Sequence, residues 1–206
     1  MKKILAGLVI SSSFLFSAPA LAKDGLYAAA DLVLSNASYK FVNPNQTAPQ
    51  NRVDGSSVGV GATLGYKKSF KQFFVAPEVF YDYLNSSSPS YFHTTQGVEG
   101  DTLEIRSRYG IKANLGYDFT QNFSSYLTYG IAALDRISRY PSFNYTQGKW
   151  ETAAIYGIGA QYHLSENWSM RAEFNSQRFN AIYYAVPGST SKIRLNVLKI
   201  GILYNF

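Results

Sequence analysis

The feature that most constrains the fold is a strict period of two in the segment LEIRSRYGIKANLGY, residues 103–117. One set of alternate positions holds leucine, isoleucine, tyrosine and alanine, with Ser107 as its only polar member. The other set holds glutamate, arginine, lysine, asparagine and glycine. Successive side chains of a β-strand point to opposite faces of the sheet. The pattern therefore predicts a strand with one apolar face and one charged face.

The same alternation recurs along the chain and predicts eight strands. They cover residues 25–35, 58–66, 73–83, 103–117, 123–133, 154–162, 168–175 and 198–206. Short connections cover residues 67–72, 118–122 and 165–167, and long ones cover residues 36–55, 85–102, 136–151 and 179–191. All short connections thus fall at one end of the strands, the short-turn end, and all long ones at the other, the long-loop end. Because the strand number is even, both termini are expected at the short-turn end.

Eight such strands fit either a water-soluble barrel with an apolar core or a membrane barrel with an apolar outside. The strand lengths favour the membrane barrel, because a tilted membrane-crossing strand needs about 9–11 residues. The polar face is also rich in glycine, which suits a narrow, crowded interior and not a face in water. These glycines are Gly59, Gly61, Gly65, Gly157 and Gly159.

An aromatic residue on the apolar face flanks every short turn, as in an aromatic girdle at a membrane–water interface. The residues are Tyr66, Phe73, Tyr117, Phe123, Tyr162, Trp168, Tyr204 and Phe206. The sequence therefore predicts an all-β fold: an eight-stranded antiparallel transmembrane up-and-down β-barrel with four long extracellular loops and short periplasmic turns. In a closed barrel the last strand pairs with the first, so the apolar end LKIGILYNF leaves no exposed edge.

The N-terminal residues predict export. Lys2 and Lys3 precede an apolar run over residues 4–16, and Ala20-Leu21-Ala22 offers a small-x-small cleavage site. This order predicts a secretory signal peptide over residues 1–22 and a mature barrel domain over residues 23–206. The alternative, a transmembrane helix anchor, needs about 20 apolar residues, and this run is shorter.

Charge and cysteine content narrow the function classes. Loss of Lys2 and Lys3 with the signal peptide lowers the formal charge from +6 to +4, and the remaining basic residues form no cluster. Nucleic acid is therefore not an expected partner. The chain has no cysteine, so disulfides do not stabilise it.

The first strand, GLYAAADL, and the terminal pattern Tyr204-x-Phe206 resemble the small bacterial outer-membrane barrels of the opacity-type and OmpA-like family. Within that group, rickettsia-type adhesins look nearest. The resemblance implies that Tyr204 and Phe206 form the signal read by the barrel assembly machinery, with outer-membrane lipid around the barrel. No peptidoglycan-binding domain is expected after Phe206. One departure is that Ile193, Leu195 and Val197 share a face with Lys199, which we attribute to a bulge or to exit from the membrane near Asn196.

The polar faces predict a charged lumen. The inward-facing charges are expected to be Glu78, Asp82, Glu104, Arg106, Arg108, Lys112, Arg171, Glu173 and Lys199, together with Asp31. One interpretation is a narrow ion path gated by salt bridges. The other is an interior filled by ion pairs, because eight strands enclose room only for side chains and buried charge needs a partner. The near balance of acids and bases favours the filled interior.

No catalytic, cofactor or metal site is predicted. A hydrolase needs a nucleophile with a histidine and an acid near one rim, and the chain has only His93 and His163. A Ser-x-x-Lys pattern at residues 189–192 is short enough to arise by chance. No group of histidines and acids has metal-ligand spacing. The protein is therefore not expected to be an enzyme.

The long connections are rich in aromatic, asparagine, serine and glycine residues, a composition typical of protein-binding loops. The expected contact residues are Trp150, Tyr140, Tyr145, Phe143, Tyr39, Phe41, Tyr91, Phe92, Tyr183 and Tyr184. This predicts an adhesin of the bacterial outer membrane that binds a host or other extracellular protein. Two alternatives remain: a structural surface antigen and a narrow small-solute channel.

Overall fold

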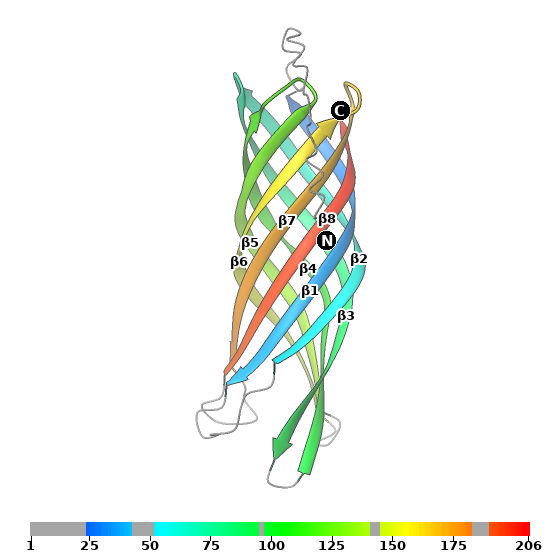
Figure 1. Ribbon diagram of the computed structural model, residues 1–206, viewed down its shortest axis with the longest axis vertical. Helices are drawn as coiled ribbons and strands as arrows, with labels where there is room; N and C mark the ends of the chain where they lie inside the picture. The colour runs from blue at the N-terminus through cyan, green and yellow to red at the C-terminus, as the bar shows by residue number, and fades with distance from the viewer. Residues whose placement is uncertain (1–23, 43–51, 95–96, 141–144, 183–189) are drawn as a thin grey trace, which may run out of the picture.

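The computed structural model describes residues 24–42, 52–94, 97–140, 145–182 and 190–206. They form eight antiparallel strands that close into a barrel in chain order, as predicted (Figure 1). The strands are β1 (Gly25–Val42), β2 (Arg52–Phe70), β3 (Phe73–Thr94), β4 (Gly97–Asp118), β5 (Phe123–Tyr140), β6 (Tyr145–His163), β7 (Trp168–Ile182) and β8 (Thr190–Asn205). Among these residues no helix is long and apolar enough to cross a membrane.

Pairing between the first and last strands closes the barrel. β1 and β8 run in register from Tyr27 opposite Asn205 to Val42 opposite Thr190. Past the end of β8, the backbone N–H of Phe206 donates to the carbonyl of Leu26 at 3.0 Å. Each unpaired backbone group in hydrocarbon costs several kcal/mol, so closure is what allows these strands to lie in lipid.

The strands are longer than the sequence predicted, and they take up most of the expected long loops. β3 and β4 each have 22 residues and stay paired out to Thr94 opposite Gly97. A membrane-crossing strand needs about 9–11 residues, so about half of each lies beyond the bilayer. Figure 1 shows this hairpin as the farthest projection of the strands at the long-loop end. The tyrosines, phenylalanines and serines read as loop residues fit a two-stranded ladder equally well, so composition did not mark the strand ends.

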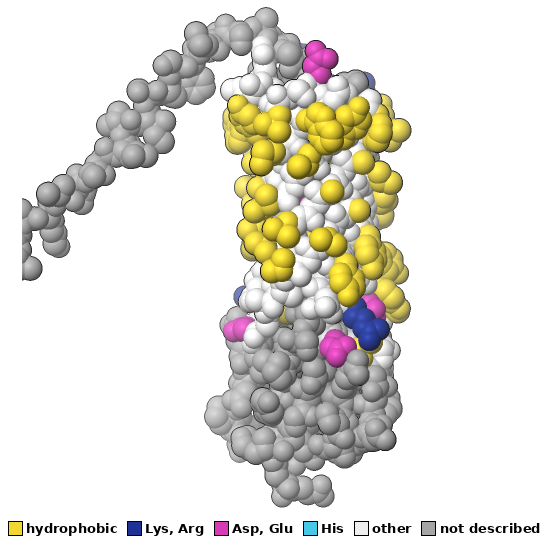
Figure 2. Space-filling model, turned by 90° about the vertical axis from the view of Figure 1, so that its right-hand side faces the viewer, with side chains coloured by type: hydrophobic (Ala, Val, Ile, Leu, Met, Phe, Trp, Pro, Cys, Tyr) yellow, Lys and Arg dark blue, Asp and Glu magenta, His cyan; other side chains and the backbone are white. Residues whose placement is uncertain are grey.

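The outer wall carries an apolar belt near the short-turn end (Figure 2). Its exposed side chains include Leu26, Leu32, Val60, Leu64, Val79, Ile111, Leu115, Leu127, Ile131, Ile158, Met170, Phe174, Ile200 and Ile202. Aromatic rings border the belt at the short-turn end, as the sequence predicted. Phe73 packs edge-on against Tyr117 with centroids 5.0 Å apart, and Tyr204 does so against Trp168 at 4.9 Å.

Two residues predicted to lie in the lumen, Glu104 and Arg106, lie on the outside of the barrel because β4 contains a bulge. The register shifts between Ile105 and Ser107, which inserts an extra residue and reverses the inward face beyond it. Ile105, expected on the lipid face, is buried inside the barrel. Arg106 and Glu104 point to the outside instead, with side chains 49 % and 24 % exposed and 3.9 Å apart.

β8 has no bulge, so of the two explanations offered for its pattern near Asn196, a bulge or exit from the membrane, the bulge is excluded. β7 and β8 pair without a register shift from Trp168 opposite Tyr204 to Ile182 opposite Thr190. Ile193, Leu195 and Val197 point inward with Lys199, and all four are buried. The parity is continuous, and it is the character of the inward face that changes from charged to apolar.

The first prediction concerns the apolar belt. Ile111 lies in the middle of the belt and is 63 % exposed. Replacing it with arginine should lower the free energy of unfolding by about 2–4 kcal/mol, because the charge enters hydrocarbon. Urea unfolding of the protein in lipid vesicles measures this, with Ile111→Ala as the uncharged control. Equal losses for the two variants would show that Ile111 does not face lipid.

Candidate functional site

The lumen is filled by three layers of side chains stacked along the barrel axis. An aromatic layer lies toward the short-turn end and consists of Tyr27, Ala29, Phe74, Ala76, Tyr126 and Leu203. A charged layer follows, made of Asp31, Glu78, Asp82, Arg108, Lys112, Arg171, Glu173 and Lys199. An apolar layer lies toward the long-loop end and consists of Val33, Ala37, Leu84, Ile105, Leu134, Phe179, Ile193, Leu195 and Val197.

In one half of the charged layer, ion pairs connect side chains of β7, β1 and β8 with side chains of β3 and β4. Arg171 donates from Nε and Nη2 to both carboxylate oxygens of Asp31, at 2.8 and 2.6 Å. Lys199 bridges Asp31 at 3.1 Å and Asp82 at 2.8 Å. Arg108 reaches the second oxygen of Asp82 at 2.8 Å. Each carboxylate here is therefore shared between two cations.

The other half of the charged layer starts again from Arg171. Its Nη1 lies 3.1 Å from Glu78, whose second oxygen lies 3.0 Å from Lys112. Lys112 also pairs with Glu173. Two aromatic-layer hydroxyls extend the network, since Tyr27 donates to Glu78 at 2.7 Å and Tyr126 donates to Glu173 at 3.2 Å.

These contacts form one unbranched chain of alternating charges, with an acid at one end and a base at the other. The order is Glu173, Lys112, Glu78, Arg171, Asp31, Lys199, Asp82 and Arg108. Every member is at most 5 % exposed, and the acids and bases cancel. Buried charges are tolerated only when they are paired and hydrogen-bonded. The network therefore fills the lumen and leaves no line of unpaired charge for an ion to follow.

A phenylalanine ring contacts the charged layer, and glycines leave room for the lumenal side chains. The Phe80 ring lies under three cations, with Lys199, Arg108 and Lys112 at 5.2, 5.3 and 5.7 Å from its centroid. A β-carbon on Gly201 would come within 2.2 Å of an Asp31 carboxylate oxygen. One on Gly159 would come within 2.2 Å of the Tyr126 ring. These close approaches explain why glycines occupy the inward face.

The apolar layer closes the lumen toward the long-loop end, and sequence reasoning missed it. Val33, Leu84, Leu134 and Leu195 have no exposed surface, and Ile105 has 1 %. A dry apolar plug excludes water and therefore strengthens the ion pairs beneath it. The run of apolar residues that share the parity of Lys199 in β8 was the available signal.

Most of the predicted partner-contact residues lie in strands and not in loops. Trp150 lies in β6 on the outer wall, 54 % exposed, with its ring 5.3 Å from that of Tyr109. Tyr140 and Tyr145 are the last cross-strand pair of β5 and β6. Backbone pairing also places Tyr39 and Phe41 in β1 and Tyr91 and Phe92 in β3, with side chains outside the described part. Phe143, Tyr183 and Tyr184 lie outside the described residues.

The described residues bring together no metal-binding group of histidine, cysteine, aspartate or glutamate. His163 lies near the short-turn end, where its Nδ1 is 2.8 Å from the Ser169 hydroxyl. His93 falls in β3 with its side chain outside the described part, and Ser189 lies outside the described residues altogether. The acids of the charged layer are all engaged with cations.

Residues 8–206 match the family of outer membrane protein beta-barrel domains. The chain belongs to this family, which confirms the resemblance to small outer-membrane barrels and supports a location in the outer membrane. No curated protein sequence matches the chain.

Solved structures of outer-membrane proteins are similar to the chain at low sequence identity. The outer membrane protein OprG of Pseudomonas aeruginosa is 14 % identical over 89 % of this chain and 97 % of its own, with a TM-score of 0.51. The outer membrane protease OmpT of Escherichia coli is 8 % identical over 89 % and 97 %, with a TM-score of 0.52. The attachment invasion locus protein Ail of Yersinia pestis is 12 % identical over 87 % and 99 %, with a TM-score of 0.46. At these identities the likeness to OprG and OmpT concerns the fold alone.

The charged layer predicts a large difference between two arginine substitutions. Arg171→Met leaves Asp31 and Glu78 short of a cation in the lumen and should cost about 3–5 kcal/mol of unfolding free energy. Arg106→Met removes an exposed guanidinium and should cost less than about 1 kcal/mol. Urea unfolding in lipid vesicles compares the two. Equal costs would contradict the assignment of Arg171 to the lumen and Arg106 to the outside.

A second consequence of the filled lumen is electrical. Purified protein in a planar bilayer should give no steady conductance, because both the charged and the apolar layer block the path for hydrated ions. Large, stable openings that scale with the amount of inserted protein would contradict the packed interior.

Proposed function

We propose that the protein is a surface-exposed adhesin, an outer-membrane barrel that binds a host or other extracellular protein through its long-loop end. The observation that carries this proposal is the extension of β3 and β4 to 22 residues each. Strands of that length raise the connections well clear of the lipid. Binding surfaces commonly lie on loops that a rigid scaffold positions.

At the base of the extension the barrel wall is apolar on its inner face and polar on its outer face, as in a water-soluble protein. Inside this wall lies the apolar layer, and outside it lie polar side chains such as Asn36, Ser56 and Arg194. Strand pairing in the extension lowers the entropy cost of binding, because it already fixes the residues at the base of each loop. The filled lumen argues against the solute-channel alternative, while a structural surface antigen would use the same architecture without a partner.

The proposal includes the route to the membrane. Residues 1–22 act as a signal peptide, and the barrel assembly machinery inserts the chain with its short turns in the periplasm. The long-loop end then faces the outside of the cell. The protein acts by binding and not by catalysis, with no cofactor.

A cell-attachment assay tests the proposal. The protein is displayed on a non-adherent bacterium, and attachment to host cells and serum proteins is measured before and after the four loop tips are shortened. Attachment should fall to background for the shortened forms while heat-sensitive gel mobility shows that the barrel remains folded. Unchanged attachment would exclude the loops as the binding surface, and the absence of any attachment would favour a structural surface antigen.

Single substitutions locate the contact. Replacing Tyr140, Tyr145 or Trp150 with alanine should weaken binding about thirtyfold if that side chain anchors the partner, because such truncations cost about 2 kcal/mol or more. Lys149→Ala, the matched change of a neighbouring charge, should have a smaller effect that declines as salt is added. Uniformly small effects of the three aromatic changes would place the contact elsewhere on the rim.

A further inference from the structure

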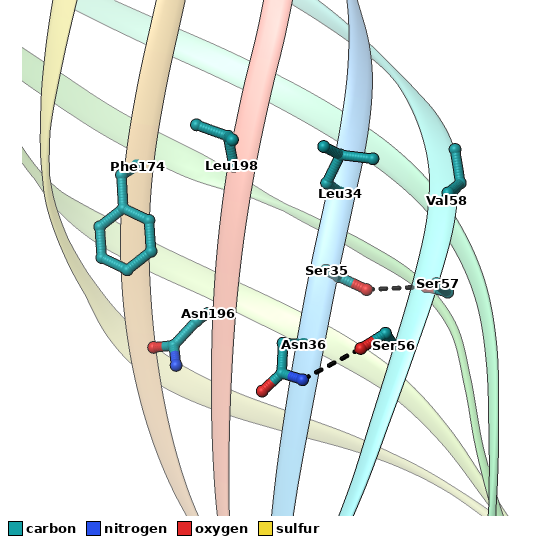
Figure 3. A pocket seen from close by; sticks show the side chains of 9 residues that line it. All are labelled: Leu34, Ser35, Asn36, Ser56, Ser57, Val58, Phe174, Asn196 and Leu198. Atoms are coloured by element: carbon teal, nitrogen blue, oxygen red, sulfur yellow. Dashed lines mark hydrogen bonds between the residues drawn. The ribbon is translucent and has the colours of Figure 1, made fainter.

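The outer wall formed by β7, β8, β1 and β2 carries a groove of about 500 Å³ where the apolar belt ends toward the long-loop end (Figure 3). Side chains along this wall lie in three tiers set by the strand register. The apolar tier is Phe174, Leu198, Leu34 and Val58. The hydrogen-bonding tier is Ser176, Asn196, Asn36 and Ser56. The charged tier is Arg178, Arg194, Ser38 and Asp54.

The hydrogen-bonding tier places amides and hydroxyls next to the apolar tier, on its side toward the long-loop end. Ser176 donates to the side-chain oxygen of Asn196 at 2.8 Å, and Asn36 donates to Ser56 at 3.1 Å. In Figure 3 the apolar side chains occupy one end of the groove, and Asn196, Asn36 and Ser56 occupy the other. The order along the wall is therefore hydrocarbon, then amide and hydroxyl, then charge.

The charged tier contains an unusual pair. Arg178 and Arg194 are directly opposite each other on neighbouring strands, and both are exposed. Like charges in this position destabilise a sheet. Within the described part of the chain neither guanidinium makes an ion pair or hydrogen bond, and the carboxylate of that tier, Asp54, accepts a hydrogen bond from Ser38 at 2.6 Å. Lys192, exposed and one tier further out, adds to the positive charge.

The spacing of the tiers matches an amphiphile in a membrane. Outward-facing residues two apart on a strand are about 7 Å apart, and the strands of such a barrel tilt by about 35–45°. The arginine pair therefore lies about 10 Å above the apolar tier along the membrane normal. The headgroup region of a bilayer leaflet is about 5–8 Å thick, so flexible arginine side chains at that level reach the phosphate depth.

We propose that this wall is a binding site for a phosphorylated lipid of the leaflet around the long-loop end. The acyl chain lies along Phe174, Leu198 and Leu34. Ester or amide groups meet Asn196 and Asn36, and the phosphate bridges Arg178 and Arg194. A phosphate between the two guanidiniums converts a repulsive pair into two charge-assisted contacts. With the orientation proposed above, the leaflet is the outer one, but the site itself does not depend on adhesion.

Native mass spectrometry of the detergent-solubilised protein tests the site. Titration with phosphatidylglycerol should show a saturable bound lipid, and Arg178→Ala/Arg194→Ala should weaken its binding at least about tenfold. The matched control, Arg106→Ala/Lys68→Ala, removes two exposed cations elsewhere on the outer surface of the barrel and should leave binding unchanged. Phosphatidylcholine should bind more weakly than phosphatidylglycerol, and glycerol phosphate should not displace the lipid at equal concentration.

Three results would overturn the proposal. Equal affinity of the wild-type protein and the double arginine variant would show that the pair does not hold the phosphate. Displacement by glycerol phosphate at equal concentration would show a site for a free anion that does not use the apolar tier. A dimer of the wild-type protein that the same variant dissociates in sedimentation experiments would show that the wall binds a second copy of the chain.

Discussion

Pairing of β1 with β8 is the constraint on which the rest of the structure depends. A strand edge cannot lie in hydrocarbon, so eight strands must close, and eight strands enclose a space that side chains fill. Inside that space a charge is stable only beside its opposite. The chain of ion pairs from Glu173 to Arg108 follows from this, as does the glycine at position 201, which leaves room for the Asp31 carboxylate. The interior is thus a solid core with no channel through it.

The barrel changes character where it leaves the lipid. Near the short-turn end the wall is apolar outside and charged inside, as at Ile200 and Lys199. Farther along the same strand, Arg194 is exposed and Leu195 is buried. One uninterrupted strand therefore passes from lipid into water. Its side chains keep alternating between the two faces, but the outer face changes from apolar to polar and the inner face from charged to apolar. This change of character supports the strand extension that we propose raises the partner-binding loops. It also supports the three-tiered wall that we propose binds lipid.

Strand number, closure and the lipid-facing positions were predictable because alternation and the aromatic girdle report them directly. The ends of the strands were not, because the β3–β4 hairpin outside the membrane has the composition of a loop. The bulge at Arg106 has no sequence signal of its own, so Glu104 and Arg106 were placed in the lumen by extending parity through it. Asp31, Glu78 and Arg171 were expected on the inward face, but their order in the ion-pair chain depends on the barrel register, which only the three-dimensional structure supplies.

Cysteine labelling tests the packed, dry interior most directly, because the natural chain contains no cysteine to interfere. Val33 lies in the apolar layer with 0 % exposure, its neighbour Leu32 lies in the apolar belt, and Asp24 is exposed at the short-turn end. Each is replaced in turn by cysteine and treated in lipid vesicles with a charged methanethiosulfonate. We expect rapid reaction at position 24 and no reaction at positions 32 and 33 until the barrel is unfolded. Reaction at position 33 as fast as at position 24, in the folded barrel, would show that water reaches the interior.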